Sequence, residues 1–224
     1  MNISIDGAAS RTTRSSERKP REERWAELLD AATGVFAEKG YDAASLQDIA
    51  ERVGILKGSI YYYIDSKADL LAHLLRETHQ TGLQNITEQS RGENDPLTRL
   101  FQMIVGHIFY VCSNLNKTAV FLREIRKLNS EQRAEILGDE HGYRRVFERV
   151  ISEGLALGLI RSQVNPKLAA VCTLSSLNSI YTWYHEGGEF TPVEIAQNLS
   201  TSTLMGLATP KGVRILASLP RVSG

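Results

Sequence analysis

Several kinds of residue and motif are scarce in this chain, and each scarcity argues against a class of protein. Two cysteines in 224 residues are too few for a disulfide-rich secreted domain. The sequence contains no H-E-x-x-H, C-x-x-C or G-x-S-x-G spacing and no phosphate-binding glycine loop, which argues against zinc enzymes, hydrolases and nucleotide-dependent enzymes. The five histidines are scattered along the chain. We therefore expect a protein that is not an enzyme, with no catalytic residues, metal ligands or cofactor.

A net charge and long apolar runs are also lacking. The 26 basic residues balance the 26 acidic ones, so the overall charge does not indicate a nucleic-acid partner. Residues 1–67 contain ten Lys or Arg against eleven Asp or Glu, so any DNA-binding surface has to be local. Residues 1–20 are polar and do not resemble a signal peptide. We expect a cytoplasmic protein without a membrane partner.

The two cysteines, Cys112 and Cys172, both lie in apolar helical sequence. Buried free thiols in a reducing cytosol are the simpler interpretation, because free cysteine behaves as a small buried hydrophobe. A disulfide between the two is the alternative.

Helical periodicity runs through most of the chain, whereas no alternating strand pattern of any length is present. Ser130 is expected to cap a long helix that continues through Leu157. The sequence predicts an all-α fold, in which a small N-terminal helix-turn-helix domain of three helices precedes a larger helical bundle. Three helices of that bundle should begin where a capping residue precedes a proline, at Asp95-Pro96, Asn165-Pro166 and Thr191-Pro192.

Residues 45–71, SLQDIAERVGILKGSIYYYIDSKADLL, predict two short helices and the start of a third. Ser45 and Asp48 have the spacing of a capping box, and Gly54 suits the left-handed conformation that ends a helix. Ser66 should cap the third helix. Two short helices joined so tightly cross at a steep angle, as in a helix-turn-helix.

The second short helix carries hydroxyl groups and is flanked by lysines. Ile60 and Ile64 can anchor it inward, whereas three consecutive tyrosines point in different directions and cannot share one buried face. An ordinary helical corner is therefore a weaker interpretation than a DNA contact. Hydroxyls, lysines and helix N-termini suit phosphate contacts. The residues expected to contact DNA are Ser45, Lys57, Gly58, Ser59, Tyr61, Tyr62, Tyr63 and Lys67.

Residues 22–71 resemble the DNA-binding domain of the TetR family of transcriptional regulators. The resemblance rests on Phe36 and Gly40 at the end of the first helix, a K-G-[ST]-[LI]-Y core in residues 57–61 and an S-K-[ED]-x-L-like opening in residues 66–70. Leu56 departs from the family, because many members have a Ser or Thr N-cap there, and its loss costs roughly 0.5–2 kcal/mol. Asp65 replaces a common proline. The resemblance implies a ligand-responsive DNA-binding regulator, more commonly a repressor than an activator.

The chain divides into four expected regions. Residues 1–20 are rich in Ser, Thr and Arg, which predicts a disordered basic arm. Such an arm either reaches into the DNA minor groove or stays solvated without a function. Residues 21–65 form the helix-turn-helix domain, residues 66–210 the ligand-binding and dimerisation domain, and residues 211–224 a C-terminal tail.

A helix over residues 166–186 is expected to be buried on more than one side, because residues 168–184 include no charge. It is too polar and too short to cross a membrane. With the following helix, 192–207, it could form a four-helix interface with a second copy, and TetR-like proteins dimerise in this way. A homodimer would hold two recognition helices about 34 Å apart, one turn of a DNA palindrome.

Helices between about residues 95 and 186 combine apolar stripes with polar residues that are hard to assign to a surface. A pocket lined by aromatic side chains and a few polar groups is typical of a small-molecule site. His107 has an ordinary interpretation as a core or surface histidine, and Arg123 as part of an ion pair. The candidate ligand residues are Phe101, His107, Tyr110, Arg123, Arg126, Tyr143, Phe147, Trp183 and Tyr184.

Residues 179–197 are similar to a W-Y-x-x-G-G-x-x-T pattern of TetR-like repressors of fatty-acid and sterol degradation, and the G-I-L of residues 54–56 also occurs in that subgroup. This resemblance implies an acyl-CoA effector, with its acyl part among apolar helices and its anionic part near Arg123, Arg126 or Arg145. The alternatives are a drug-like hydrophobic effector and a helical interaction module that does not bind DNA. The ligand is expected to move the helix that starts at Ser66 and so change the spacing of the recognition helices.

Overall fold

The structure is a computed structural model that describes residues 20–92, 94–138 and 142–223. The expected basic arm, except for Pro20, lies outside these residues. The described chain is helical and confirms the all-α fold; its one extended pairing is an isolated bridge between Ile160 and Ala208. The helices are α1 (Arg21–Ala43), α2 (Leu46–Val53), α3 (Lys57–Ile60), α4 (Lys67–Gln89), α5 (Pro96–Ser113), α6 (Leu115–Glu124), α7 (Ser130–Leu137), α8 (Gly142–Ala156), α9 (Pro166–Asn178), α10 (Pro192–Leu207) and α11 (Pro210–Ser218), with 3-10 turns η1 (Ile125–Lys127) and η2 (Ser179–Thr182).

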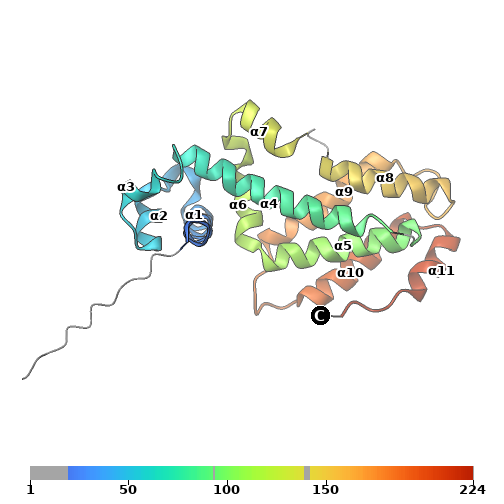
Figure 1. Cartoon of the computed structure of the whole chain (residues 1–224). Coiled ribbons are helices and arrows are strands. Elements are labelled where there is room, and N and C mark those ends of the chain that lie inside the picture. The colour runs from blue at the N-terminus through green and yellow to red at the C-terminus, as the bar shows by residue number, and fades with distance from the viewer. Residues whose placement is uncertain (1–19, 93, 139–141, 224) are drawn as a thin grey trace, which may run out of the picture.

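The helices form two bodies joined by α4 (Figure 1). α1, α2 and α3 make a small lobe at one end, and the later helices make the larger bundle. The first half of α4 contributes Leu70, Leu71 and Leu74 to the core of the lobe, and its second half contributes Ile86 to the core of the bundle. One continuous helix is therefore packed in both cores.

Most helix starts follow the expected caps. Ser45 forms a full capping box with Asp48, and the Ser66 hydroxyl accepts a hydrogen bond from the backbone N–H of Asp69. Gly54 ends α2 with φ of 73°, in the left-handed region that favours glycine. The caps before proline are also confirmed, at Asp95, Asn165 and Thr191.

The expected long helix from Ser130 through Leu157 is wrong. Asn129, rather than Ser130, caps α7 by accepting a hydrogen bond from the backbone N–H of Gln132. α7 then ends at Gly138, whose φ of 61° is incompatible with a right-handed helix. α8 begins separately at Gly142.

Two further boundaries differ from expectation. The expected helix 166–186 ends as an α-helix at Asn178 and continues as the 3-10 turn η2. Here the hydroxyls of Ser179 and Thr182 donate to carbonyls three residues earlier, a local alternative to α-helical bonding. The expected tail 211–224 contains most of α11. This helix begins in the same way as α5, α9 and α10, with a capping residue, Thr209, before a proline at N1, Pro210.

The expectation of two buried thiols is correct in part. Both cysteines are free. Cys112 is half-buried, and this burial raises the pKa of its thiol to about 11. Cys172 is exposed on α9, so its environment was predicted wrongly. Among the described helices, none is long and apolar enough to cross a membrane.

Candidate DNA-binding surface and effector cavity

The turn before α3, the helix itself and the two tyrosines that follow it present an exposed surface around the buried Ile60. Ile60 and Ile64 are buried and anchor this segment in the core of the lobe. Leu56 is 81% exposed and provides no side-chain cap for α3. The exposed residues are Leu56, Lys57, Gly58, Ser59, Tyr61 and Tyr62, so five of the eight expected DNA contacts lie together on one accessible surface.

Tyr63 and Ser45 have protein partners. The ring of Tyr63 is half-buried and stacks on Trp25 with 6.2 Å between the ring centroids. The Ser45 hydroxyl donates to the Asp48 carboxylate at 2.8 Å and accepts from the Asp48 backbone N–H at 3.2 Å. Hydrogen bonds from Lys39 and Ser45 lower the pKa of Asp48 to about 2. Both residues therefore stabilise the lobe.

Lys67 is also engaged within the protein. Its ammonium group donates to the carbonyl oxygens of Tyr41 at 2.8 Å and of Ala44 at 2.7 Å. The same group lies over the Tyr41 ring, 4.4 Å from the centroid. Lys67 thus ties the start of α4 to the connection between α1 and α2.

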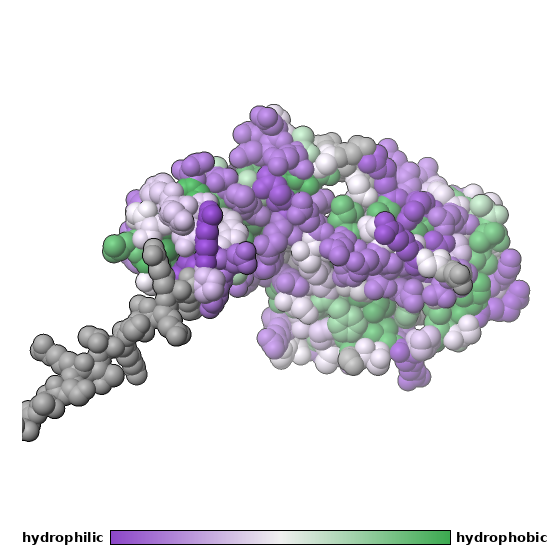
Figure 2. All heavy atoms as spheres, viewed as in Figure 1, coloured by the Kyte–Doolittle hydropathy of each residue, from purple (hydrophilic) through white to green (hydrophobic). Residues whose placement is uncertain are grey.

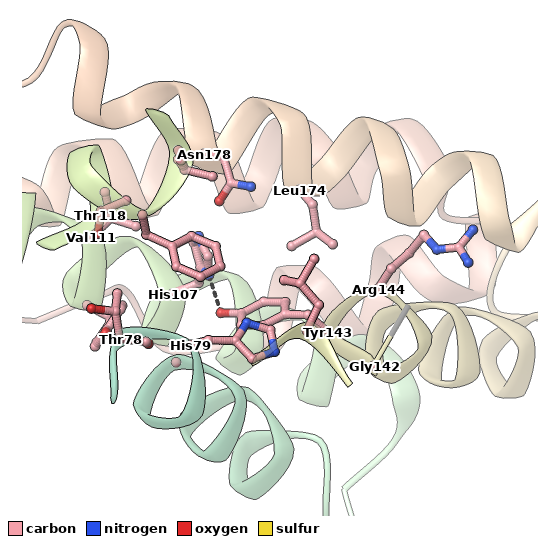
Figure 3. A pocket seen from close by; sticks show the side chains of 15 residues that line it. Thr78, His79, His107, Val111, Thr118, Gly142, Tyr143, Arg144, Leu174 and Asn178 are labelled. Atoms are coloured by element: carbon pink, nitrogen blue, oxygen red, sulfur yellow. Dashed lines mark hydrogen bonds between the residues drawn. The ribbon is translucent and has the colours of Figure 1, made fainter. Parts of the chain in front are cut away.

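A cavity of about 210 Å³ lies inside the bundle, where α4 to α9 converge (Figure 3). Three of the nine expected ligand residues line it: His107, Tyr110 and Tyr143. The lining also includes residues that sequence reasoning did not select, namely Thr78, His79, Gly82, Val111, Thr118, Phe121, Leu122, Leu137, Gly142, Arg144, Leu174 and Asn178. Most of the lining is apolar or aromatic, as is usual for small-molecule sites.

The polar groups of the cavity form a neutral cluster. His107 Nδ1 lies 2.7 Å from the Tyr143 hydroxyl (Figure 3), and the Tyr110 hydroxyl donates to the Thr78 carbonyl at 3.0 Å. Burial lowers the pKa of His107 to about 4, and a hydrogen-bonding interaction with the Asn178 side chain opposes this shift. Burial raises the pKa of Tyr110 to about 12. At neutral pH these side chains are therefore uncharged.

Two buried polar atoms of this cluster have no hydrogen-bond partner. They are His107 Nε2 and Thr118 Oγ1. Asn178 lies in the same lining and is near enough to affect the pKa of His107, but it does not complete a hydrogen bond with Nε2. Buried polar groups are nearly always paired, so these two atoms mark a place where an occupant could bind.

Four of the expected ligand residues do not line the cavity. Phe147 is fully buried in the bundle core. Phe101 lines a different groove beside α10 and α11. Arg123 is exposed on α6 with its guanidinium over the Tyr181 ring, 5.4 Å from the centroid, and Arg126 is exposed in η1.

Trp183 and Tyr184 are also outside the cavity. They follow η2 and line a separate hollow with Phe190, and the Trp183 side chain is 46% exposed. The reason is the early end of α9, because residues beyond Asn178 no longer follow its helical face. Asn178 and Leu174, still on α9, line the cavity instead.

α6 connects the cavity to the lobe. Its residues Thr118, Phe121 and Leu122 line the cavity. The carboxylate of Glu124, at the end of the same helix, accepts a hydrogen bond from the backbone N–H of Tyr41 at 3.3 Å. Cavity and lobe thus share a helix in addition to α4.

α9 and α10 expose uncharged stripes with helical spacing. Figure 2 shows a hydrophobic patch in the region of α5 and α10, and another at the end of the bundle far from the lobe, among hydrophilic areas. Such stripes are suited to packing against another helix surface. The stripes are Leu168, Val171, Cys172, Ser175 and Ser176 on α9, and Thr201, Ser202, Met205 and Gly206 on α10.

Metal binding finds no support in the part of the chain that the structure describes, which contains no group of three or more His, Cys, Asp or Glu side chains able to hold an ion.

Comparison with known proteins covers both parts of the chain. Residues 28–74 match the family described as bacterial regulatory proteins, tetR family, and residues 93–207 match the tetracyclin repressor-like C-terminal domain. The fatty acid metabolism regulator protein of Bacillus subtilis is 24% identical over 190 residues, which cover 84% of this chain and 98% of that protein. The transcriptional repressor KstR2 of Rhodococcus jostii is 28% identical over 188 residues, covering 84% of this chain and 92% of KstR2.

A solved structure is also similar to this chain over most of its length. AibR in complex with isovaleryl coenzyme A and operator DNA is 25% identical and superposes with a TM-score of 0.74, covering 80% of this chain and 97% of AibR.

Proposed function

Since this chain belongs to the TetR family of bacterial regulatory proteins, we propose that it represses transcription by binding operator DNA as a homodimer and leaves the DNA when a short acyl-CoA thioester occupies the bundle cavity. Its relatives are transcriptional regulators rather than enzymes. The proposal concerns the operator contacts, the dimer and the effector.

The exposed surface around α3 supports the proposed DNA contacts. Lys57, Ser59, Tyr61 and Tyr62 offer a charge and three hydroxyls for phosphate contacts. Leu56, at the N-terminus of the recognition helix, is placed where side chains of helix-turn-helix proteins reach base edges. An apolar side chain at that point suits the methyl group of thymine.

The observation that carries the regulatory part of the proposal is the shared helix α6. Thr118 and Phe121 contact the cavity, and Glu124 of the same helix holds the backbone of Tyr41 in the lobe. An occupant that displaces α6 or α4 therefore changes the position of the lobe relative to the bundle. The effector can shift this equilibrium only by its different affinity for the two arrangements.

Cavity size and lining support a short acyl group. The cavity volume of about 210 Å³ is below the 300–1,000 Å³ that is usual for ligand pockets. Arg144 lies in the lining with its guanidinium directed away from the His107–Tyr143 pair, a suitable place for the anionic part of a thioester (Figure 3). The names of the relatives, which refer to fatty-acid metabolism and to isovaleryl coenzyme A, agree with this effector class.

The uncharged stripes of α9 and α10 support a homodimer. Leu168 and Val171 on α9 and Met205 on α10 are exposed apolar side chains on these stripes. A second copy that covers them would bury apolar surface, at a gain of about 25 cal/mol per Å². Analytical ultracentrifugation is expected to give twice the mass of the 24.9 kDa chain.

The proposal is tested by fluorescence anisotropy of the purified protein on the DNA upstream of its own gene. We expect salt-sensitive binding, because phosphate contacts release counterions. Isovaleryl-CoA and hexanoyl-CoA should release the DNA, whereas free coenzyme A and palmitoyl-CoA should not. Binding that no thioester affects would reject the effector class, and the absence of salt-sensitive binding would reject the DNA-binding role.

A further inference from the structure

The two unpartnered polar atoms of the cavity specify the effector further. His107 is 5% exposed and Thr118 is 7% exposed, so water from the surface does not reach either side chain freely. A polar atom that is buried without a partner loses the hydrogen bonds that it made in the unfolded chain. Both atoms, His107 Nε2 and Thr118 Oγ1, belong to the lining of one cavity.

Thr118 differs from three other buried hydroxyls on helices. The hydroxyls of Thr33, Thr78 and Ser200 each donate to the carbonyl oxygen four residues earlier, at 2.7–2.9 Å. That local bond is the usual way for a buried helical hydroxyl to be satisfied. Thr118 lies in the first turn of α6, where the carbonyl four residues earlier belongs to the N-cap Asn114, and its hydroxyl does not form this bond. Its hydroxyl is therefore available to an occupant of the cavity.

His107 is held in place through its other nitrogen. The Tyr143 hydroxyl, 2.7 Å from Nδ1, fixes the ring and leaves Nε2 unpaired. Depending on the tautomer, Nε2 donates or accepts a hydrogen bond. A ligand hydroxyl can satisfy either tautomer, and a ligand carbonyl can satisfy the one with a proton on Nε2.

We propose that the acyl group of the effector carries an uncharged oxygen, a hydroxyl or a keto group, that hydrogen-bonds to His107 Nε2 and Thr118 Oγ1 inside the cavity. This inference rests on the proposed function, which supplies the acyl-CoA effector. A carboxylate is disfavoured at this point, because burial keeps His107 neutral and the cation of the lining, Arg144, points away from the pair.

Matched pairs of thioesters test the inference by isothermal titration calorimetry. The pairs are isovaleryl-CoA with β-hydroxyisovaleryl-CoA, hexanoyl-CoA with its ω-hydroxy and ω-1 keto forms, and cyclohexanecarbonyl-CoA with its ring-hydroxylated form. In at least one pair the oxygenated member should bind roughly 5- to 150-fold more tightly, the factor that corresponds to a buried polar group left unsatisfied. Equal affinities in every pair would overturn the inference while leaving the acyl-CoA effector intact.

Substitutions with matched shape locate the effect. Thr118→Val removes the unpartnered hydroxyl, so it should weaken binding of the oxygenated thioester and strengthen binding of its hydrocarbon partner. Thr78→Val is the control, because it makes the same change in the same lining where the hydroxyl is already bonded to Leu74. It should leave the preference unchanged. An equal loss of preference in both variants would contradict the assignment to Thr118.

His107→Gln provides a second check that does not depend on Thr118, since a glutamine amide can offer a polar group near the position of Nε2. The preference for the oxygenated thioester should survive in His107→Gln and fall in His107→Leu. Circular dichroism spectra establish that each variant is folded. If no thioester binds the folded wild-type protein, the proposed function fails first, and this inference fails with it.

Discussion

Replacement of Lys67 separates a structural role from a DNA contact. The ammonium group has two short bonds to backbone carbonyls and lies over the ring of Tyr41. The substitution Lys67→Met keeps the length of the side chain but removes its charge and hydrogen bonds. We expect the variant to unfold more easily and to bind operator DNA with an unchanged dependence on salt.

The magnitude follows from these contacts. Hydrogen bonds from a charged group contribute about 1.5–3 kcal/mol each, and a cation over an aromatic ring about 0.5–1 kcal/mol. Lys67 is half-exposed, so water replaces part of what is lost, and a total of about 2–3 kcal/mol is reasonable. For a chain of this size the melting temperature should fall by roughly 4–12 °C.

The assay combines thermal unfolding with operator binding at several salt concentrations. Each phosphate contact contributes about 0.9 to the slope of log affinity against log salt. Lys57→Met is the matched control, because Lys57 is exposed at the start of α3 among the expected DNA contacts. It should reduce the slope by about 1 and leave the melting temperature unchanged. The reasoning would be refuted if Lys67→Met kept the wild-type melting temperature while its slope of log affinity against log salt fell by about 1.

Four further predictions concern the cavity, the contact of α6 with the lobe, the titration of His107 and the exposed Leu56. Leu174→Trp should fill the cavity and abolish release by acyl-CoA without weakening operator binding, whereas Trp183→Ala, outside the cavity, should respond like the wild type in the same anisotropy assay. Glu124→Gln should leave acyl-CoA affinity within about threefold of wild type by calorimetry but reduce DNA release, because it weakens the bond to the lobe; full release would show that α6 does not transmit the signal. The pKa of His107 is lowered from 6.5 to about 4 in the folded protein. Between these pH values the unfolded chain binds more protons than the folded one. The free energy of unfolding should therefore be about 2 kcal/mol lower at pH 5 than at pH 7. Urea denaturation measures this, and the difference should shrink in His107→Leu. Leu56→Ala should weaken operator binding. This loss of affinity should disappear on an operator in which the contacted thymine is replaced by uracil, which lacks the methyl group.

Sequence reasoning succeeded where the decisive interactions are local. The capping box of Ser45, the left-handed Gly54 and the cap of Ser66 each involve groups within a few residues of one another, so the helix starts could be predicted from spacing alone. The exposed surface around Lys57 was predictable for the same reason, since a short helix anchored by Ile60 has only one way to face solvent.

The cavity depended on the packing of distant segments. Its lining comes from six helices, and residues as far apart as Thr78 and Asn178 meet there. A helical stripe shows which side chains are turned inward, but it does not distinguish a tightly packed core position such as Phe147 from a cavity position such as Tyr143.

The sequence by itself determined the helical fold, the exposure of the residues around α3 and the membership of the family, because these follow from local hydrogen bonds, periodic burial and local motifs. Only the tertiary structure decided which polar groups remain without partners. Lys67 resembles a phosphate contact in the sequence, yet its partners are carbonyls more than twenty residues away. Thr118 resembles any buried threonine in the sequence, yet its hydroxyl has no hydrogen-bond partner. Hydrogen bonds between residues far apart in the sequence are set by three-dimensional packing, which spacing along the chain does not encode.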